Sequence, residues 1–238
     1  MAEIMYLTAG LIVTIGAILQ GSAGIGLGFV AVPLLVLIDP SFIPGPLLLS
    51  ALVLTLLVTY REHRSIDFKG LPWAVAGRII GTLLGVAALG LVPGEKISLL
   101  FGSVILLAVA LSLSGLRLSI NNKNLFGTGT LSGFMGTTSA IGGVPMALIY
   151  QDYEGPRLRG TLSGIFVIGT IISIFSLAVI GKFGLPEIQL AAILIPGILI
   201  GFVISRHTAA ILDKGFIRPV VLTVAVLAGL GVIVRTLF

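Results

Sequence analysis

The sequence predicts an all-α polytopic membrane protein made of two inverted repeats, and three observations lead to this prediction. Of the 238 residues, 57% are hydrophobic and 10% are charged, whereas soluble domains carry about 25% charged residues. The apolar residues form long segments separated by short polar loops. Two of these segments contain glycine-rich interruptions at comparable places in the two halves of the chain.

The apolar segments are expected to be helices. A helix that spans a bilayer needs about 20 apolar residues, and lipid forces backbone polar groups to pair internally, which excludes open strands. The segments lie at 4–38, 46–60, 71–92, 97–116, 125–150, 160–181, 188–205 and 216–237.

The first segment is too long for one span and short for two full spans, at about 1.5 Å per residue. Its middle is rich in glycine, and each glycine weakens a helix by about 1 kcal/mol relative to alanine. We therefore expect the helix to break there, with Pro33 as a structural helix-break. The interruption reads Gln20-Gly21-Ser22-Ala23-Gly24-Ile25-Gly26-Leu27-Gly28.

A similar run in segment 125–150 predicts a second break, with Pro145 as its helix-break. It reads Gly136-Thr137-Thr138-Ser139-Ala140-Ile141-Gly142-Gly143-Val144-Pro145. Further along, Gly81-x3-Gly85 is echoed by Gly197-x3-Gly201. Because these elements keep their order, the chain is expected to hold repeats at 1–118 and 119–238 that together form one transport domain.

Lysine and arginine positions test the topology. If every segment crosses the membrane, the loop and terminal cations split seven against six. If both glycine-rich segments are hairpins, ten fall on one face and three on the other, which follows the positive-inside rule. This predicts two broken hairpins and six full spans in the plasma (inner) membrane, inverted repeats and two non-cytoplasmic termini. The ten are Arg61, Arg64, Lys69, Arg117, Lys123, Arg157, Arg159, Arg206, Lys214 and Arg218; the three are Lys96, Lys182 and Arg235.

The two breaks are the candidate substrate site. A broken helix exposes backbone N–H groups and a partial positive charge, and glycine lets an anion approach the backbone. Inverted symmetry would bring both breaks together near the bilayer midplane, with the short arms of segment 125–150 as half-helices. The alternative is that the small residues only allow close helix packing. The candidate residues are Gln20, Gly21, Ser22, Gly24, Gly26 and Gly28, with Gly136, Thr137, Thr138, Ser139, Gly142 and Gly143.

Arg78 is the charged residue deep inside an apolar segment. A charge within the membrane is costly and is a functional hypothesis by default. Arg78 would contact an anionic substrate or hold a helix break; the alternative is that it snorkels to the interface. Arg157 and Arg159 follow Asp152 and Glu154, which favours a loop with local ion pairs over a binding site.

Other site classes find little support in the sequence. There is no cysteine, which excludes disulfides and thiol chemistry. His63 and His207 lack partners at metal-ligand spacing, so neither a metal nor a cofactor is expected. No catalytic triad pattern and no carboxylate within a span is visible, so the chain offers no obvious proton relay. The net charge of +5 fits cytoplasmic loops rather than nucleic-acid binding.

At the two breaks the chain resembles the sulfite exporter TauE/SafE family of membrane permeases. The matching stretches run from Gly21 to Pro33 and from Ile141 to Gln151, with Arg159-Gly-Thr-Leu following. Leu27 and Val144 depart from the family pattern, where Gly and Pro are common. The resemblance implies transport of sulfite or an organosulfonate.

A secondary transporter with alternating access is therefore the leading hypothesis. An anion channel and an intramembrane enzyme are the alternatives. The exact anion, the direction, proton coupling and the oligomeric state stay open.

Overall fold

The computed structural model describes residues 2–153 and 155–212, and this part of the chain is helical without strands. Its helices follow the predicted segments as far as residue 212, whereas the predicted segment 216–237, with Lys214, Arg218 and Arg235, lies outside the described residues. The helices are α1 Ala2–Ala23, α2 Leu27–Ile38, α3 Gly45–Arg61, α4 Leu71–Leu91, α5 Ile97–Leu113, α6 Asn122–Ser139, α7 Gly143–Ile149, α8 Gly155–Val179 and α9 Leu185–Leu212, with short 3-10 turns at Pro40–Phe42, His63–Ser65 and Gly94–Lys96.

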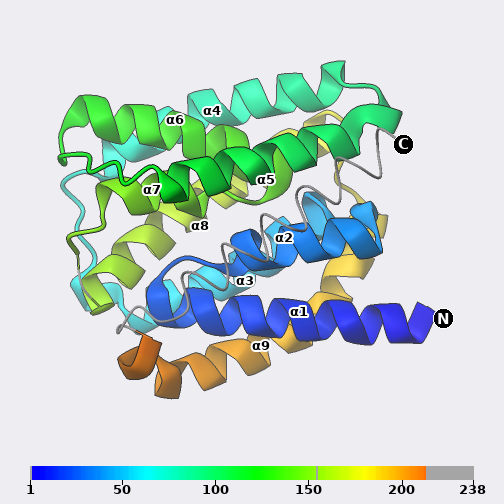
Figure 1. Cartoon of the computed structure of the whole chain (residues 1–238), viewed down its shortest axis with the longest axis horizontal. Helices are drawn as coiled ribbons and strands as arrows, with labels where there is room; N and C mark the ends of the chain where they lie inside the picture. Colours follow the sequence, from blue (N-terminus) through cyan, green and yellow to red (C-terminus); the bar gives the residue numbers. More distant parts are fainter. Residues whose placement is uncertain (1, 154, 213–238) are drawn as a thin grey trace.

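The helices run roughly along the long axis of the molecule, with α1 beside α9 and α4 beside α6 (Figure 1). Within the described residues, four helices are long and apolar enough to cross a membrane: Glu3–Ala23, Leu71–Leu91, Gly155–Val179 and Leu185–Ala209. α3 and α5 were predicted as full spans; they are apolar but shorter, at 17 residues each.

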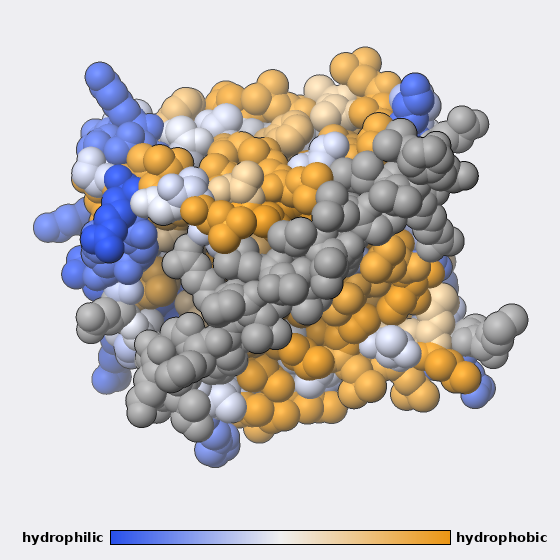
Figure 2. All heavy atoms as spheres, in the orientation of Figure 1, coloured by the Kyte–Doolittle hydropathy of each residue, from blue (hydrophilic) through white to orange (hydrophobic). Residues whose placement is uncertain are grey.

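Large apolar side chains are exposed along the flanks of the bundle. Leu7 and Leu11 on α1, Leu83 on α4 and Phe175 on α8 are each more than half exposed. Figure 2 shows apolar residues across the middle of the molecule and hydrophilic residues gathered mainly at its left end, where α3 ends and α8 begins. Soluble monomers rarely expose apolar area on this scale, so these exposed apolar flanks are typical of a multi-pass membrane protein.

The first predicted break reverses the chain between α1 and α2. Gly24 and Gly26 have φ of 83° and 142°, conformations that residues with a Cβ adopt rarely. Gly16 of α1 packs against the backbone of Leu27, at the start of α2. The ring centroids of Tyr6 and Phe42 lie 6.5 Å apart. The far ends of the two arms therefore meet again, and the segment is a hairpin.

The second break joins α6 to α7 through Ala140, which has φ of 60°. Leu125, near the start of α6, and Tyr150, just after α7, belong to one buried cluster and both lie against Gly70, so the ends of this hairpin also meet. The predicted half-helix arms are wrong, because α6 has 18 residues and α7 has seven. α6 stays helical to Ser139 since its glycines pack closely on α4, with Gly129 against the Ala74 backbone.

Pro33 and Pro145 do not break the helices, contrary to the prediction. Pro33 lies inside α2 and Pro145 lies in the first turn of α7. A first-turn proline gives up an N–H that has no intrahelical partner, and an interior proline removes one hydrogen bond. The reversals come instead from the positive φ values of Gly24, Gly26 and Ala140, before each second arm.

Glycines let two helix pairs approach backbone to backbone. Gly77 and Gly81 of α4 lie against the carbonyls of Phe126 and Thr130 on α6. Gly197 and Gly201 of α9 lie against the carbonyls of Gly10 and Thr14 on α1. Gly85, the other predicted glycine on α4, lies against the carbonyl of Phe134 on α6 in the same way.

Candidate functional site

A cavity of about 350 Å³ lies where the two breaks meet. The backbone of Gly28 packs against the carbonyl of Ala140, and Gly143 lies against the side chain of Ile25. The hairpins are therefore in direct contact, as the sequence predicted for the two glycine-rich runs. The predicted site residues that line the cavity are Gln20, Gly26, Gly28, Arg78, Gly136, Gly142 and Gly143.

Arg78 extends from α4 into the bundle, and only 2% of its surface is exposed. Its Nη1 donates to the Ser132 hydroxyl at 2.6 Å, and that hydroxyl donates to the Gly142 carbonyl at 2.5 Å. The guanidinium carbon lies 5.4 Å from the ring centroid of Phe166. Arg78 thus holds the second break through Ser132 and also reaches the cavity, so the snorkelling alternative is wrong.

No carboxylate pairs with Arg78 among the described residues; the ion pairs there involve Arg61, Arg157 and Arg159. The Arg78 Nε is buried and has no hydrogen-bond partner in that part of the chain. Apart from the Ser132 hydroxyl and the face of the Phe166 ring, no protein group that the structure describes compensates the charge.

Three glycines make room for the guanidinium. A Cβ on Gly169 would collide with Arg78 Nε, and Cβ atoms on Gly136 or Gly142 would crowd its two terminal nitrogens. A ligand at the second break would therefore meet backbone and guanidinium, without intervening side chains at these positions. Of these, Gly136 and Gly142 were predicted and Gly169 was not.

Gln20 stabilises the first break from within. Its Oε1 accepts a hydrogen bond from the Leu27 N–H at 3.2 Å, at the first residue of α2. The Gln20 side chain therefore caps one of the free amides at the N-terminus of α2, which carries a partial positive charge. This end of α2 borders the cavity at Gly26 and Gly28.

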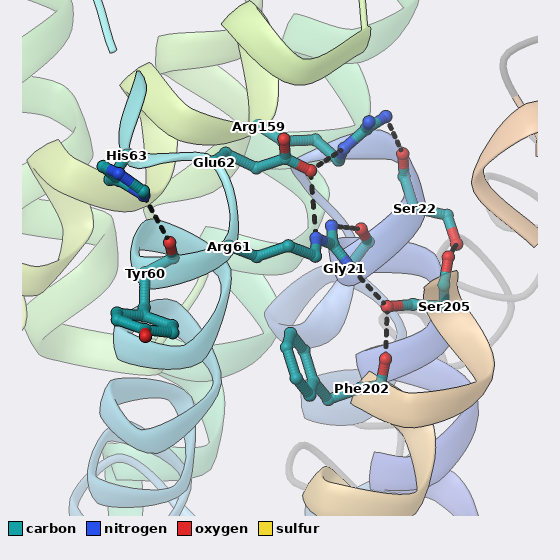
Figure 3. A network of polar contacts seen from close by, with 9 residues as sticks. All are labelled: Gly21, Ser22, Tyr60, Arg61, Glu62, His63, Arg159, Phe202 and Ser205. Atoms are coloured by element: carbon teal, nitrogen blue, oxygen red, sulfur yellow. Dashed lines mark hydrogen bonds and ion pairs between the residues drawn. The ribbon is translucent and has the colours of Figure 1, made fainter. Parts of the chain in front are cut away.

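Gly21, Ser22 and Gly24 lie outside the cavity lining. Gly21 and Ser22 belong to an ionic network at the end of α1 (Figure 3), and Gly24 lies against the backbone of Arg159. Arg61 Nη2 donates to the Gly21 carbonyl at 2.5 Å, and Arg159 Nη1 donates to the Ser22 carbonyl at 2.9 Å. The last carbonyls of a helix have no intrahelical partners and carry partial negative charge, so two guanidinium groups satisfy them well.

Glu62 joins these two arginines. Its Oε1 lies 2.9 Å from Arg61 Nε and 3.1 Å from Arg159 Nε. Arg61 Nη1 also donates to the Ser205 hydroxyl at 3.0 Å. Glu62 and its two arginines therefore tie the end of α1 to α3, α8 and α9, as Figure 3 shows. We refer to Arg61, Glu62 and Arg159 as the ionic latch.

Three further predicted site residues do not line the cavity. Thr138 and Ser139 donate to carbonyls of their own helix, Phe134 and Met135. Thr137 lies 2.8 Å from the Ser173 hydroxyl and donates to Thr82 at 3.1 Å. Their hydroxyls are engaged between helices or within α6, which is a packing role.

In the described part of the chain, the ion pairs of Arg157 and Arg159 are long-range, with Asp67 and Glu62; the predicted local partner Glu154 lies outside the described residues. Arg157 Nη2 lies 2.7 Å from Asp67 Oδ2, and the Tyr153 hydroxyl donates to the same oxygen at 2.5 Å. The Tyr153 hydroxyl, the Lys69 amide and Arg157 lower the pKa of Asp67 to about 2. The contacts of Asp67 with Tyr153 and Arg157 join the loop before α4 to the start of α8, outside the cavity.

A family model described as Sulfite exporter TauE/SafE matches residues 8–232 of the chain. The chain belongs to this family. No curated protein and no solved structure matches it. The matched range contains both breaks, Arg78 and the ionic latch, and the resemblance noted in the sequence is confirmed. Membership of the sulfite exporter family identifies the protein as a membrane transporter.

The structure adds TauE/SafE site candidates that the sequence did not single out. One face of α8 runs along the cavity and carries Leu158, Leu162, Phe166 and Thr170 at intervals of four residues. Leu48, Ala51 and Thr55, spaced three and four residues apart, form such a face on α3. The spacing was visible in the sequence, but it does not tell which helical face meets a cavity and which meets another helix.

Proposed function

We propose that this chain is a secondary transporter that moves a small anion, sulfite or an organosulfonate, across the plasma membrane by alternating access. The observation that carries the proposal is Arg78, a buried cation on the cavity between the two breaks. An isolated buried charge is expensive unless it is paired. A bound oxyanion would supply the missing charge.

The chemistry around Arg78 suits an oxyanion. A guanidinium presents a planar fork of N–H donors that binds two oxygens at once. Arg78 Nη1 is engaged by Ser132, which fixes the orientation of the fork. Gly136 and Gly142 leave space beside the guanidinium, and the N-terminus of α2 adds positive potential.

The packing pattern supports the inverted repeats 1–118 and 119–238. α1, the first helix of one half, packs on α9 of the other; α6, the first helix of the second half, packs on α4 of the first. A two-fold relation between the halves exchanges these pairs. Both use glycine-to-carbonyl contacts. Movement of one repeat against the other around the shared cavity would give alternating access.

The proposed topology places both termini outside the cytoplasm. The positive-inside rule assigns the face with Arg61, Arg64 and Arg157 to the cytoplasm and the face with Lys96 and Lys182 to the other side. Coupling to protons has no support from a carboxylate on the cavity lining in the described residues.

Flux of labelled sulfite into proteoliposomes tests the proposal. Wild-type flux should saturate with concentration, and Arg78→Ala should weaken apparent affinity by about 10- to 100-fold, the value of a charged hydrogen bond. Arg78→Lys should restore only part of it, because lysine lacks the fork. Arg64→Ala, at an exposed arginine, is the matched control.

Three results would redirect the proposal. Equal affinity in wild type and Arg78→Ala would remove Arg78 from the site. Non-saturating ionic current would favour the channel alternative. Recovery of chemically altered sulfite from the vesicles would favour an enzyme.

A further inference from the structure

We propose that the preferred substrate is an organic monoanion with an apolar body of several carbons, bound with its oxyanion head at Arg78. This inference rests on the proposed function and specifies its substrate class. It follows from three features of the cavity: its charge, the placement of that charge, and its size relative to an inorganic oxyanion.

The cavity offers one unit of positive charge. Arg78 is the charged side chain on its lining in the described part of the chain; the other polar side chains there are neutral, such as Thr55, Gln151 and Thr170. One cation balances one anionic group. A second negative charge on the ligand would face no second cation and would lose its hydration at a cost of several kcal/mol.

The charge lies on one part of a lining that continues along α8. The guanidinium stacks over Phe166 and touches Gly169. From Phe166 the cavity face of α8 continues through Leu162 to Leu158, which is two turns, or about 12 Å, at about 1.5 Å per residue. Leu148 and Ala147 of α7 also line the cavity. A head group at Arg78 therefore leaves aliphatic surface for the rest of the ligand.

The cavity is large for sulfite. Its volume is about 350 Å³, within the range of about 300–1,000 Å³ typical of sites for small organic ligands. Sulfite has four heavy atoms, and its bulk is similar to that of two water molecules. Two waters occupy about 60 Å³ in the liquid, which is far less than the cavity volume. Sites for organic ligands combine mostly apolar walls with a few polar groups that set orientation, and this lining has that character.

Equilibrium binding of a ligand series to the purified chain in detergent tests the inference. Methanesulfonate and butane-1-sulfonate share a head group, and propane-1,3-disulfonate adds a second charge. Each buried methylene should raise affinity about fourfold, so butane-1-sulfonate should bind about 60-fold tighter than methanesulfonate. The disulfonate should bind more weakly than butane-1-sulfonate.

A cavity-filling variant locates the apolar subsite. Ala147→Leu adds bulk on the α7 side of the lining and should reduce the butane-to-methane affinity ratio at least fivefold. Ala178→Leu makes the same change at an exposed position of α8 outside the lining and should leave the ratio unchanged. The wild-type series stands independently if Ala147→Leu fails to fold.

The outcomes separate this inference from the proposed function. If sulfite and methanesulfonate bind through Arg78 and affinity does not rise with chain length, the cavity is an access path and the inference is overturned while the transporter proposal stands. If the disulfonate binds as tightly as butane-1-sulfonate, the single-charge argument is overturned. If no anion binds, both proposals fail.

Discussion

At the scale of single residues, the position of Arg78 depends on the absence of side chains around it. A Cβ on Gly169 would occupy the space of Arg78 Nε. The arginine would have to move within a packed interior, which also contains its partner Ser132. The predicted contact between Arg78 and the substrate therefore depends on Gly169 of α8 as well as on the arginine of α4.

Gly169→Ala should lower the free energy of unfolding by about 1–3 kcal/mol, the cost of overpacking a core, and should weaken anion affinity. Gly164→Ala on the same helix is the control, since its Cβ would make ordinary contacts with Ile66 and Leu71 at 3.9–4.0 Å. Chemical denaturation in detergent and anion binding measure the two effects. A Gly169→Ala protein as stable and as tightly binding as Gly164→Ala would contradict the described geometry.

Residue-level prediction found cavity-lining positions where backbone conformation or buried charge was the signal, and their role in substrate binding stays a prediction. Gly26, Gly28, Gly142 and Arg78 line the cavity as predicted. It failed for hydroxyl groups, such as those of Thr138 and Ser139, because a hydroxyl within a helix can bond to a carbonyl of the preceding turn. The sequence alone does not distinguish a hydroxyl that bonds to its own helix from a hydroxyl that donates to a ligand.

At the scale of helices, the ionic latch fixes the end of α1 next to the first break. Glu62, Arg61 and Arg159 have side-chain exposures of 12%, 17% and 8%. Two guanidinium groups share one carboxylate, and both also bind carbonyls of α1. Without the carboxylate, like charges would face each other at a mostly buried site.

Glu62→Gln should therefore lower the free energy of unfolding by about 3 kcal/mol, near the low end for breaking a buried ion pair. Because Glu62 does not line the cavity, anion affinity of the folded variant should stay within about twofold of wild type. Glu3→Gln, at an exposed position of α1, should change stability by less than about 0.5 kcal/mol. A stability loss in Glu62→Gln no larger than in Glu3→Gln would show that the latch contributes little.

The helices and both breaks could be predicted from apolar length and glycine content, because lipid imposes length and backbone pairing on each segment. The ionic latch could not be predicted from the sequence. Glu62 and Arg159 are far apart in sequence, and their local context reads as polar loop. The unequal arms of the second hairpin were also missed, since glycine weakens an isolated helix whereas here Gly129 and Gly133 fasten α6 to α4.

At the scale of the whole molecule, the account predicts opposite exposure of two lysine positions. The chain has no cysteine, so single cysteines report topology without background. Lys96→Cys should react with an impermeant thiol reagent added to intact cells, and Lys123→Cys should react only after the membrane is opened. The reverse pattern would invert the proposed topology, and equal labelling of both from outside would exclude it.

Protection of a cysteine in the cavity by an anion tests the central claim most directly. Ala147→Cys, on the lining contributed by α7, should be alkylated more slowly when sulfite or methanesulfonate is present. The protection should disappear in Ala147→Cys combined with Arg78→Ala, and alkylation of the exposed Lys123→Cys should not respond to either anion. Protection that persists without Arg78, or no protection with Arg78 present, would contradict an anion site at Arg78 between the two broken hairpins.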